Sequence, residues 1–152
     1  MMLTRSSDYA MRALVHLAQC PDGKAERLDS IAKAQKVPPA LLSKILQTLV
    51  RAGVVRSQKG YGGGYALVSD PKVLTMREVI ELIDGPVVVF ECLADDKFCN
   101  LCEACQLRAR FTAIQDTVLG MMTETTLWDC IPSGGPVPGT SRAMSGGRSA
   151  QA

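Results

Sequence analysis

A glycine-rich segment flanked by two β-prone runs constrains the fold of this chain more than any other feature. The runs cover residues 54–57 and 65–68, and the sequence QKGYGGG joins them. Such runs on both sides of a turn-forming segment predict a β-hairpin. Its tip carries the cation Lys59. Because glycine has no Cβ atom, the main chain of this tip could approach another molecule closely.

Two short helices are predicted directly before the hairpin. Leu28, Ile31 and Ala32 are spaced along one face of the first helix. The second helix begins at a proline pair and ends before a glycine, which are favoured start and stop signals. Its apolar stripe consists of Leu41, Leu42, Ile45, Leu46 and Leu49. Its opposite side exposes Ser43, Lys44, Gln47 and Arg51. This pair of helices has the pattern of a helix-turn-helix.

A helix-turn-helix followed by a glycine-rich hairpin is the outline of a winged helix, in which the second helix enters the major groove of DNA and the wing touches the adjoining backbone. The charges agree with this interpretation. Residues 1–65 hold ten Lys/Arg and four Asp/Glu, a net of +6, whereas residues 66–130 hold five and eleven, a net of −6. The alternative is a plain helical hairpin and β-ribbon with an unevenly charged, solvated surface.

Three further helices complete a mainly α fold with a small β-wing. One is expected over residues 8–19, capped by Ser6 or Ser7, and another over residues 74–85, capped by Thr75. A long helix over residues 103–126 carries an apolar seam suited to pairing with a second copy. The seam consists of Leu107, Phe111, Ile114, Val118 and Met121. The tail from residue 131 is rich in Gly, Pro and Ser and is expected to be disordered.

Four of the six cysteines lie in residues 92–105, the cysteine segment, with the pattern Cys-x6-Cys-x2-Cys-x2-Cys. We expect a cytoplasmic protein, because the N-terminus lacks a signal-peptide pattern and no apolar run is long enough to span a membrane. In a reducing compartment, such clustering favours metal or redox chemistry over disulfides. The tight spacing favours an iron–sulfur cluster over zinc, which stays possible. The single histidine, His16, is not expected to bind a metal, and Cys20 and Cys130 are expected to be ordinary thiols.

Together these motifs resemble the IscR/NsrR/RirA family of winged-helix regulators. The resemblance rests on LTRSSDYAMRAL, LLSKILQTLVRAG, KGYGGGYAL, LTMREVIELIDG and the cysteine segment. It implies a homodimeric transcription factor that reads a palindromic operator in double-stranded DNA. It also implies an iron–sulfur cluster, of 4Fe-4S or 2Fe-2S type, between the wing domain and the dimerisation helix. The expected organisation is a DNA-binding domain (1–85), a cluster loop (86–106), a dimerisation helix (103–130) and a disordered tail (131–152).

The resemblance implies that Cys92, Cys99 and Cys105 are metal ligands. The fourth ligand stays open. Arg108 stands where the IscR branch has a histidine, so that ligand is missing. Asp8 matches an aspartate that the partner subunit supplies in the NsrR branch, and Cys102 is an alternative within the segment itself.

The expected DNA contacts lie on the second helix of the pair, on the wing and at the N-terminus. They comprise Arg5, Ala40, Ser43, Lys44, Lys59, Tyr61, Gly62 and Gly63. No catalytic dyad or nucleotide-binding loop is evident, so we do not expect an enzyme. The sequence thus predicts a DNA-binding regulator whose operator affinity depends on an iron–sulfur cluster that senses nitric oxide, iron supply or redox stress. A cluster-free thiol or persulfide switch on the same fold is the main alternative, and a small electron carrier is a remote one.

Overall fold

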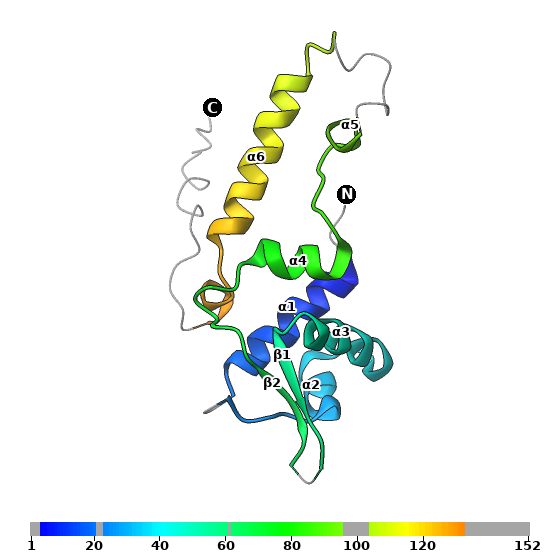
Figure 1. Ribbon diagram of the computed structural model, residues 1–152, viewed down its shortest axis with the longest axis vertical. Coiled ribbons are helices and arrows are strands. Elements are labelled where there is room, and N and C mark those ends of the chain that lie inside the picture. The colour runs from blue at the N-terminus through cyan, green and yellow to red at the C-terminus, as the bar shows by residue number, and fades with distance from the viewer. Residues whose placement is uncertain (1–3, 21–22, 61, 96–103, 133–152) are drawn as a thin grey trace, which may run out of the picture.

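Three helices and a hairpin make up the lower half of the computed structural model in Figure 1. The structure describes residues 4–20, 23–60, 62–95 and 104–132. The elements of this half are α1 (Arg5–Ala18), α2 (Leu28–Gln35), α3 (Pro39–Arg51), β1 (Val55–Gln58) and β2 (Gly64–Leu67). Together with α4 (Met76–Asp84), they form what we call the winged-helix body, residues 4–84. The predicted fold class, mainly helical with a small β-wing, is confirmed.

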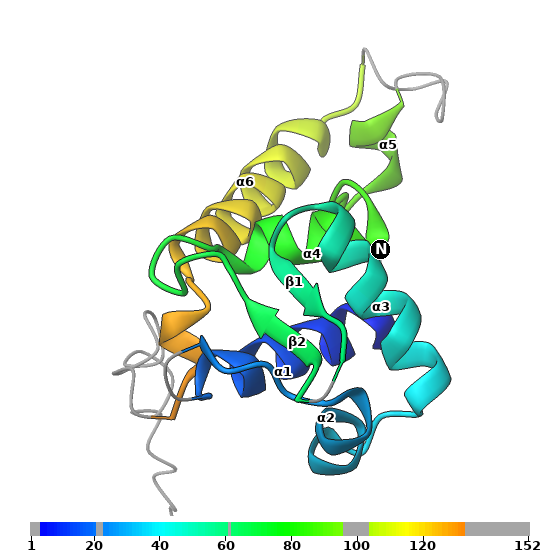
Figure 2. The same ribbon diagram turned by 60° about the horizontal axis from the view of Figure 1, so that its bottom comes forward.

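The core of the body lies among α1, α2, α3, α4 and the hairpin. Figure 2 shows the hairpin crossing α1 beside α3. Each helix buries the apolar stripe that its sequence predicts. The fully buried side chains include Leu14, Leu17, Leu42, Leu46, Leu49, Val55 and Val79. The outer sides of α3 and of the hairpin are therefore left to polar and charged residues.

Helix α1 begins at Arg5, earlier than the expected residue 8, because Thr4 and not Ser6 or Ser7 is its N-cap. The Thr4 side chain accepts hydrogen bonds from the backbone N–H groups of Ser6 and Ser7, at 3.1 and 3.4 Å. Ser7 is itself buried, and its hydroxyl donates to the Thr4 carbonyl. Thr4 also donates to the Asp84 carboxylate at 2.6 Å, which joins the start of α1 to the end of α4.

The hairpin is an antiparallel pair in which Val55 faces Leu67 and Gln58 faces Gly64. Residue 26 extends this ladder, because the N–H and carbonyl groups of Glu26 and Tyr65 bond to each other at 2.8 Å. Gly64 allows this close approach: a Cβ atom there would lie 2.2 Å from the Glu26 carbonyl oxygen. The wing is thus fixed at its base to the segment that leads into α2.

After α4 the chain leaves the body and returns through a long helix. Residues 86–90 lead to α5 (Glu91–Ala94), a short turn of helix that the sequence did not predict. Helix α6 (Arg108–Glu124) runs back from the far end of the molecule to the body (Figure 1). We call the described residues from 86 to 124 the α6 arm. A single 3-10 turn, Trp128–Cys130, follows it.

Helix α6 is shorter than the predicted helix over residues 103–126. It begins at Arg108, because residues 104–107 form turns, and it ends at Glu124, because Thr125 is extended. Residues 125–127 instead pair with the start of α4: the Met76 N–H donates to the Thr125 carbonyl, and the Leu127 N–H donates to the Leu74 carbonyl, both at 2.8 Å. Ile131, the first residue of the expected tail, is buried, and residues 133–152 lie outside the described residues.

Candidate DNA-binding surface and cysteine segment

Helix α3 presents the predicted contact residues on the side away from the core. Ala40 and Lys44 are exposed and Ser43 is half-buried, whereas Leu42 and Leu46 are fully buried on the opposite side. A weak hydrogen bond of 3.4 Å joins the Gln47 amide to the Ser43 hydroxyl. The outer side of α3 is therefore a row of short polar groups and cations of the kind that reach base edges and phosphates.

None of the described carboxylates forms an ion pair with the cations of α3 and the hairpin. Lys44, Arg51, Arg56 and Lys59 are exposed. Among the residues that the structure describes, the only ion pairs are Arg12–Asp8 and Arg77–Glu81, which lie on α1 and α4. The four cations can therefore attract the phosphates of a nucleic acid.

The tip of the wing has the glycine geometry that the sequence predicts. Gly60 and Gly62 adopt positive φ angles of 96° and 77°, which favour glycine. A Cβ atom on Gly63 would lie 2.4 Å from the Gln58 carbonyl oxygen. Beside this tip is a hollow of about 550 Å³ with Arg27 at its edge. Of the other predicted contacts, Arg5 is exposed at the start of α1, and Tyr61 lies outside the described residues.

The two ends of the cysteine segment are both bonded to Arg108. Its guanidinium donates to the Cys92 carbonyl at 3.4 Å, and its backbone N–H donates to the Cys105 carbonyl at 3.2 Å. Both cysteines are half-buried free thiols. Cys99 and Cys102 lie outside the described residues. Arg108, which sequence reasoning noted only as the site of a missing ligand, thus links the ends of the segment at the start of α6.

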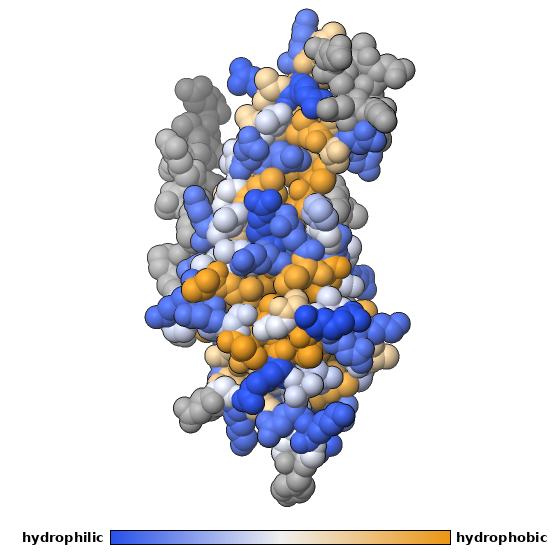
Figure 3. All heavy atoms as spheres, viewed as in Figure 1, coloured by the Kyte–Doolittle hydropathy of each residue, from blue (hydrophilic) through white to orange (hydrophobic). Residues whose placement is uncertain are grey.

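An aromatic stack holds α5 against α6. The rings of Phe90 and Phe111 lie 4.2 Å apart, nearly parallel at 13°. One turn further along α6, the Gln115 side chain accepts a hydrogen bond from the Val89 N–H at 3.0 Å. Figure 3 shows apolar surface between α6 and the segment that leads to α5, and again across α4. The stack fixes the position of Cys92, which follows Phe90 by two residues.

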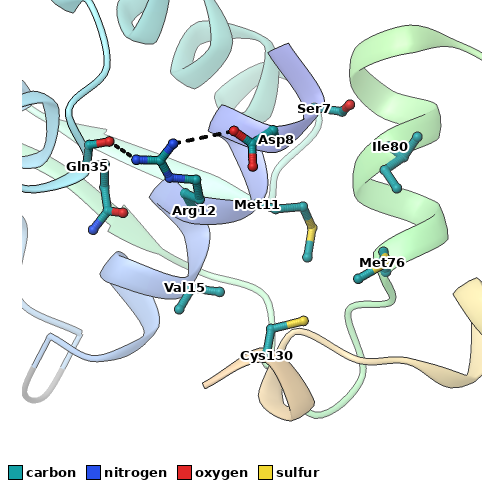
Figure 4. A pocket seen from close by; sticks show the side chains of 9 residues that line it. All are labelled: Ser7, Asp8, Met11, Arg12, Val15, Gln35, Met76, Ile80 and Cys130. Carbon is teal, nitrogen blue, oxygen red and sulfur yellow. Dashed lines mark hydrogen bonds and ion pairs between the residues drawn. The ribbon is translucent and has the colours of Figure 1, made fainter. Parts of the chain in front are cut away.

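Asp8 lies at the rim of a pocket of about 390 Å³ between α1, α4 and the turn at Cys130. Figure 4 shows Met11, Met76 and Cys130 pointing into it. The Asp8 carboxylate is largely exposed and pairs with Arg12 at 3.4 Å. Burial, and to a lesser extent Asp129, raises the pKa of the Cys130 thiol. Sequence reasoning missed this apolar pocket, because its residues come from four separate segments of the chain.

A helix-turn-helix, a glycine-rich wing and a cationic outer face define a winged-helix DNA-binding protein. Residues 3–133 match the Rrf2 family, described as iron-dependent transcriptional regulators. The chain is 32% identical to an Rrf2-like HTH-type regulator of Rhodobacter capsulatus over 143 residues, covering 89% of this chain and 95% of the relative. It is also 30% identical to an HTH-type regulator of Mycobacterium tuberculosis, over 91% of this chain and 84% of that protein. The chain therefore belongs to the Rrf2 family of transcriptional regulators.

Solved structures agree with this assignment. A transcriptional regulator from Listeria innocua superposes with a TM-score of 0.74 at 26% identity, covering 95% of this chain and 96% of that one. CymR, the global cysteine regulator of B. subtilis, has a TM-score of 0.68 at 26% identity, over 86% and 95%. IscR of T. potens shares the fold, with a TM-score of 0.66 at 21% identity, over 86% and 85%. None of the helices within the described residues is long and apolar enough to cross a membrane.

Proposed function

We propose that this chain is a dimeric transcriptional regulator whose operator affinity is controlled by an iron–sulfur cluster in the cysteine segment. The observation that carries the proposal is the position of Arg108, which binds the carbonyls of both Cys92 and Cys105. A change in the segment would therefore act directly on the first residue of α6.

Dimerisation is supported by the apolar seam of α6. Leu107, Ile114 and Met121 are 57%, 48% and 53% exposed, and they recur on one side of the helix. Of the seventeen residues of α6, only Met122 is buried. A second copy would cover this seam and would place two recognition helices on a palindrome.

The donor set of the cysteine segment fits an iron–sulfur cluster. Thiolates are the usual ligands of such clusters, and Cys92 and Cys105 are half-buried at the joint between α5 and α6. With Cys99 they would hold the cluster, and Asp8 or Cys102 would complete its coordination. When bound, the cluster supplies iron that exchanges electrons and reacts with oxidants or nitric oxide.

Coupling to DNA would proceed through the α6 arm. The Phe90–Phe111 stack and the Arg108 bonds fix α5 to α6, and the pairing of residues 125–127 with the start of α4 fixes α6 to the body. The cysteine segment with its cluster and the same segment without it would favour different positions of the α6 arm. The spacing of the two recognition helices in the dimer would then differ between the two states. Such a switch requires that the two states differ in affinity for the operator.

The test uses anaerobically purified protein and a palindromic DNA fragment that the protein selects from a random library. Visible absorption with iron and sulfide analysis should show a cluster, and operator affinity should differ between the holo and apo forms at one fixed salt concentration. Cys92→Ser and Cys105→Ser should lose the cluster, whereas Cys130→Ser should retain it. Asp8→Ala and Cys102→Ala, compared separately, identify the fourth ligand. Equal affinities of the holo and apo forms would overturn cluster control.

A cluster-free thiol switch is the second candidate, because CymR of S. aureus, whose fold is similar, has been solved in an oxidised form. On this alternative the purified protein contains no iron or sulfide. Its operator affinity then changes on treatment with peroxide or persulfide, and replacing Cys99, Cys102 or Cys105 by Ser abolishes that response.

A further inference from the structure

Three side chains that commonly bind metals meet beside the C-terminal end of α1, outside the cysteine segment. They are His16, Cys20 and Glu26, and one ligand atom of each lies within 4.8 Å of the others. All three residues are half-buried, so they are partly shielded and still open to an ion from solvent. His16 and Cys20 are one helical turn apart, but no sequence pattern links them to Glu26, which belongs to an irregular segment.

The backbone holds each of the three residues in place. His16 lies in the last turn of α1, and the Cys20 thiol donates to the His16 carbonyl at 3.6 Å, which keeps this side chain against the helix end. Glu26 is fixed by its two backbone hydrogen bonds to Tyr65 on β2. The cluster is therefore built from a helix end and a strand-like segment and not from exposed side chains of one loop.

A second group supports the histidine. The side-chain nitrogen Nε2 of Gln35, at the end of α2, lies 3.3 Å from His16 Nδ1. The backbone carbonyl of Gln35 also accepts a hydrogen bond from the Arg12 guanidinium of α1. Both the side chain and the backbone of Gln35 therefore join α2 to α1. A metal-bound histidine usually has its other ring nitrogen held by such a partner, which fixes the orientation of the ring. With its amide oxygen turned toward Nδ1, Gln35 would accept that proton and leave Nε2 for an ion.

We propose that His16, Cys20 and Glu26 form a three-ligand site for a divalent transition metal ion, with Zn²⁺ the best match. Imidazole, thiolate and carboxylate are the three ligand types that zinc uses in proteins, at bond lengths of about 2.0–2.3 Å. A tetrahedron of such bonds separates the ligand atoms by about 3.3–3.8 Å. Side-chain rotations that close the cluster by about 1 Å would reach this geometry, and water would take the fourth position. Binding would form a zinc–sulfur bond and release the Cys20 thiol proton to solvent.

The position of the site gives the ion a consequence for the wing. It would join the end of α1 to Glu26, whose backbone is bonded to β2, while Gln35 joins the histidine to α2. Three elements around the recognition helix would thus be cross-linked by one ion. The metal site itself does not depend on the proposed function. Only an effect of the bound ion on operator affinity rests on that function.

Cobalt(II) is the probe of choice, because a thiolate bound to Co²⁺ absorbs in the near ultraviolet and reports the sulfur ligand directly. The experiment uses the full chain with Cys92, Cys99, Cys102 and Cys105 all replaced by Ser, so that the cysteine segment cannot contribute thiolates. In this background the matched pair is Cys20→Ser and Cys130→Ser. Both thiols are half-buried, and Cys130 likewise donates to the carbonyl four residues before it, that of Thr126 at 3.5 Å.

We expect one Co²⁺ per chain with a thiolate band in the background protein and in its Cys130→Ser variant, displaced by one equivalent of Zn²⁺. The band should disappear in Cys20→Ser. His16→Gln and Glu26→Gln should bind at least about tenfold more weakly, the scale seen even for supporting residues of metal sites. Circular dichroism of the metal-free variants confirms that each is folded. A background protein without the band, or a band that survives Cys20→Ser and is lost in Cys130→Ser, would overturn the site. No DNA is present, so this outcome does not depend on the proposed function.

Discussion

In the winged-helix body the apolar faces of α1, α3 and the hairpin cover one another, whereas the apolar seam of α6 is covered over little of its length. Leu14, Leu42, Leu46 and Leu49 are fully buried in the body. On the α6 arm, Leu107 and Met121 remain more than half exposed. The body is thus stabilised by contacts within one chain, whereas three of the five seam residues of the arm are exposed. Fewer contacts set the position of the arm than set the positions of the elements of the body. We therefore expect any control of DNA binding to act through the arm.

A buried leucine and several hydrogen bonds join the two regions. Leu127 is fully buried in the body core, and its N–H bonds to the Leu74 carbonyl at 2.8 Å. Beside it, the Asp129 carboxylate accepts hydrogen bonds from the Thr126 side chain and backbone, and these lower the Asp129 pKa. One end of α6 is therefore anchored to the body, while the other end carries the cysteine segment.

The comparison predicts that truncating a leucine lowers the free energy of unfolding much more in the body than in the arm. Leu46→Ala, in the body core, should lower the free energy of unfolding by about 2–5 kcal/mol, because it leaves a cavity among α1, α3 and the hairpin. Leu107→Ala, on the α6 arm, should change the free energy of unfolding of the monomer by less than about 0.5 kcal/mol, because that side chain is exposed until a second copy covers it. Urea denaturation at one protein concentration, below the dissociation constant of the proposed dimer, measures both. Equal losses would show that the body and the arm form a single cooperative core.

The exposed seam of α6 predicts a dimer that one charge can break. Ile114→Asp should weaken self-association by about 2 kcal/mol or more, roughly 30-fold, because it places a carboxylate in an apolar interface. Thr112→Asp is the matched control, since it lies two residues away and hence about 200° around the helix. Sedimentation equilibrium of both variants measures the dissociation constant. If Thr112→Asp has the larger effect, the seam does not form the interface.

The body was largely predictable from the sequence, because its elements follow local rules. The apolar stripe of α3, the hairpin around Lys59 and the Thr75 cap of α4 all depend on residues within a few positions of each other, and the structure confirms them. The start of α1 was predicted wrongly, because three neighbouring hydroxyl residues compete as caps. Thr4 is the N-cap because it also bonds to Asp84, eighty positions away.

The sites depend on contacts that no local pattern contains. The role of Arg108 arises from a fold that returns Cys92 to the start of α6, and the pocket beside Asp8 needs α1, α4 and Cys130 together. His16 and Cys20 are one helical turn apart and could be suspected as a pair, but Glu26 joins them only through its pairing with the wing. The assembly of Cys92, Cys99, Cys105 and a fourth ligand stays a prediction.

The N-cap of α4 lies at the joint, and its removal should have a smaller effect on stability than a core substitution. Thr75→Ala should lower the free energy of unfolding by about 1 kcal/mol, since it breaks a capping box with Glu78. The Thr75 hydrogen bonds lower the pKa of Glu78 below its ordinary value of 4.5. The stabilisation is therefore complete above pH 4.5 and is lost as the pH falls through the lower, folded-state pKa. Thermal melts from neutral to acid pH should show a parent curve that falls more steeply than that of the variant. Parallel curves would contradict the coupling of Thr75 and Glu78.

The smallest expected effect is that of a single cation on the recognition helix. Lys44→Ala should reduce the slope of log affinity against log salt by about 0.9, the contribution of one phosphate contact. The ratio of the parent protein's operator affinity to that of Lys44→Ala should then be about 3.5-fold smaller at 200 mM salt than at 50 mM. Lys72→Ala is the control, because the Lys72 ammonium lies over the Trp128 ring, 5.0 Å from its centre, on the side of the joint. If both variants change the slope equally, the chain binds DNA through its overall charge. If only Lys44→Ala does, the outer side of α3 is the contact surface, because the loss of one cation there removes one phosphate contact.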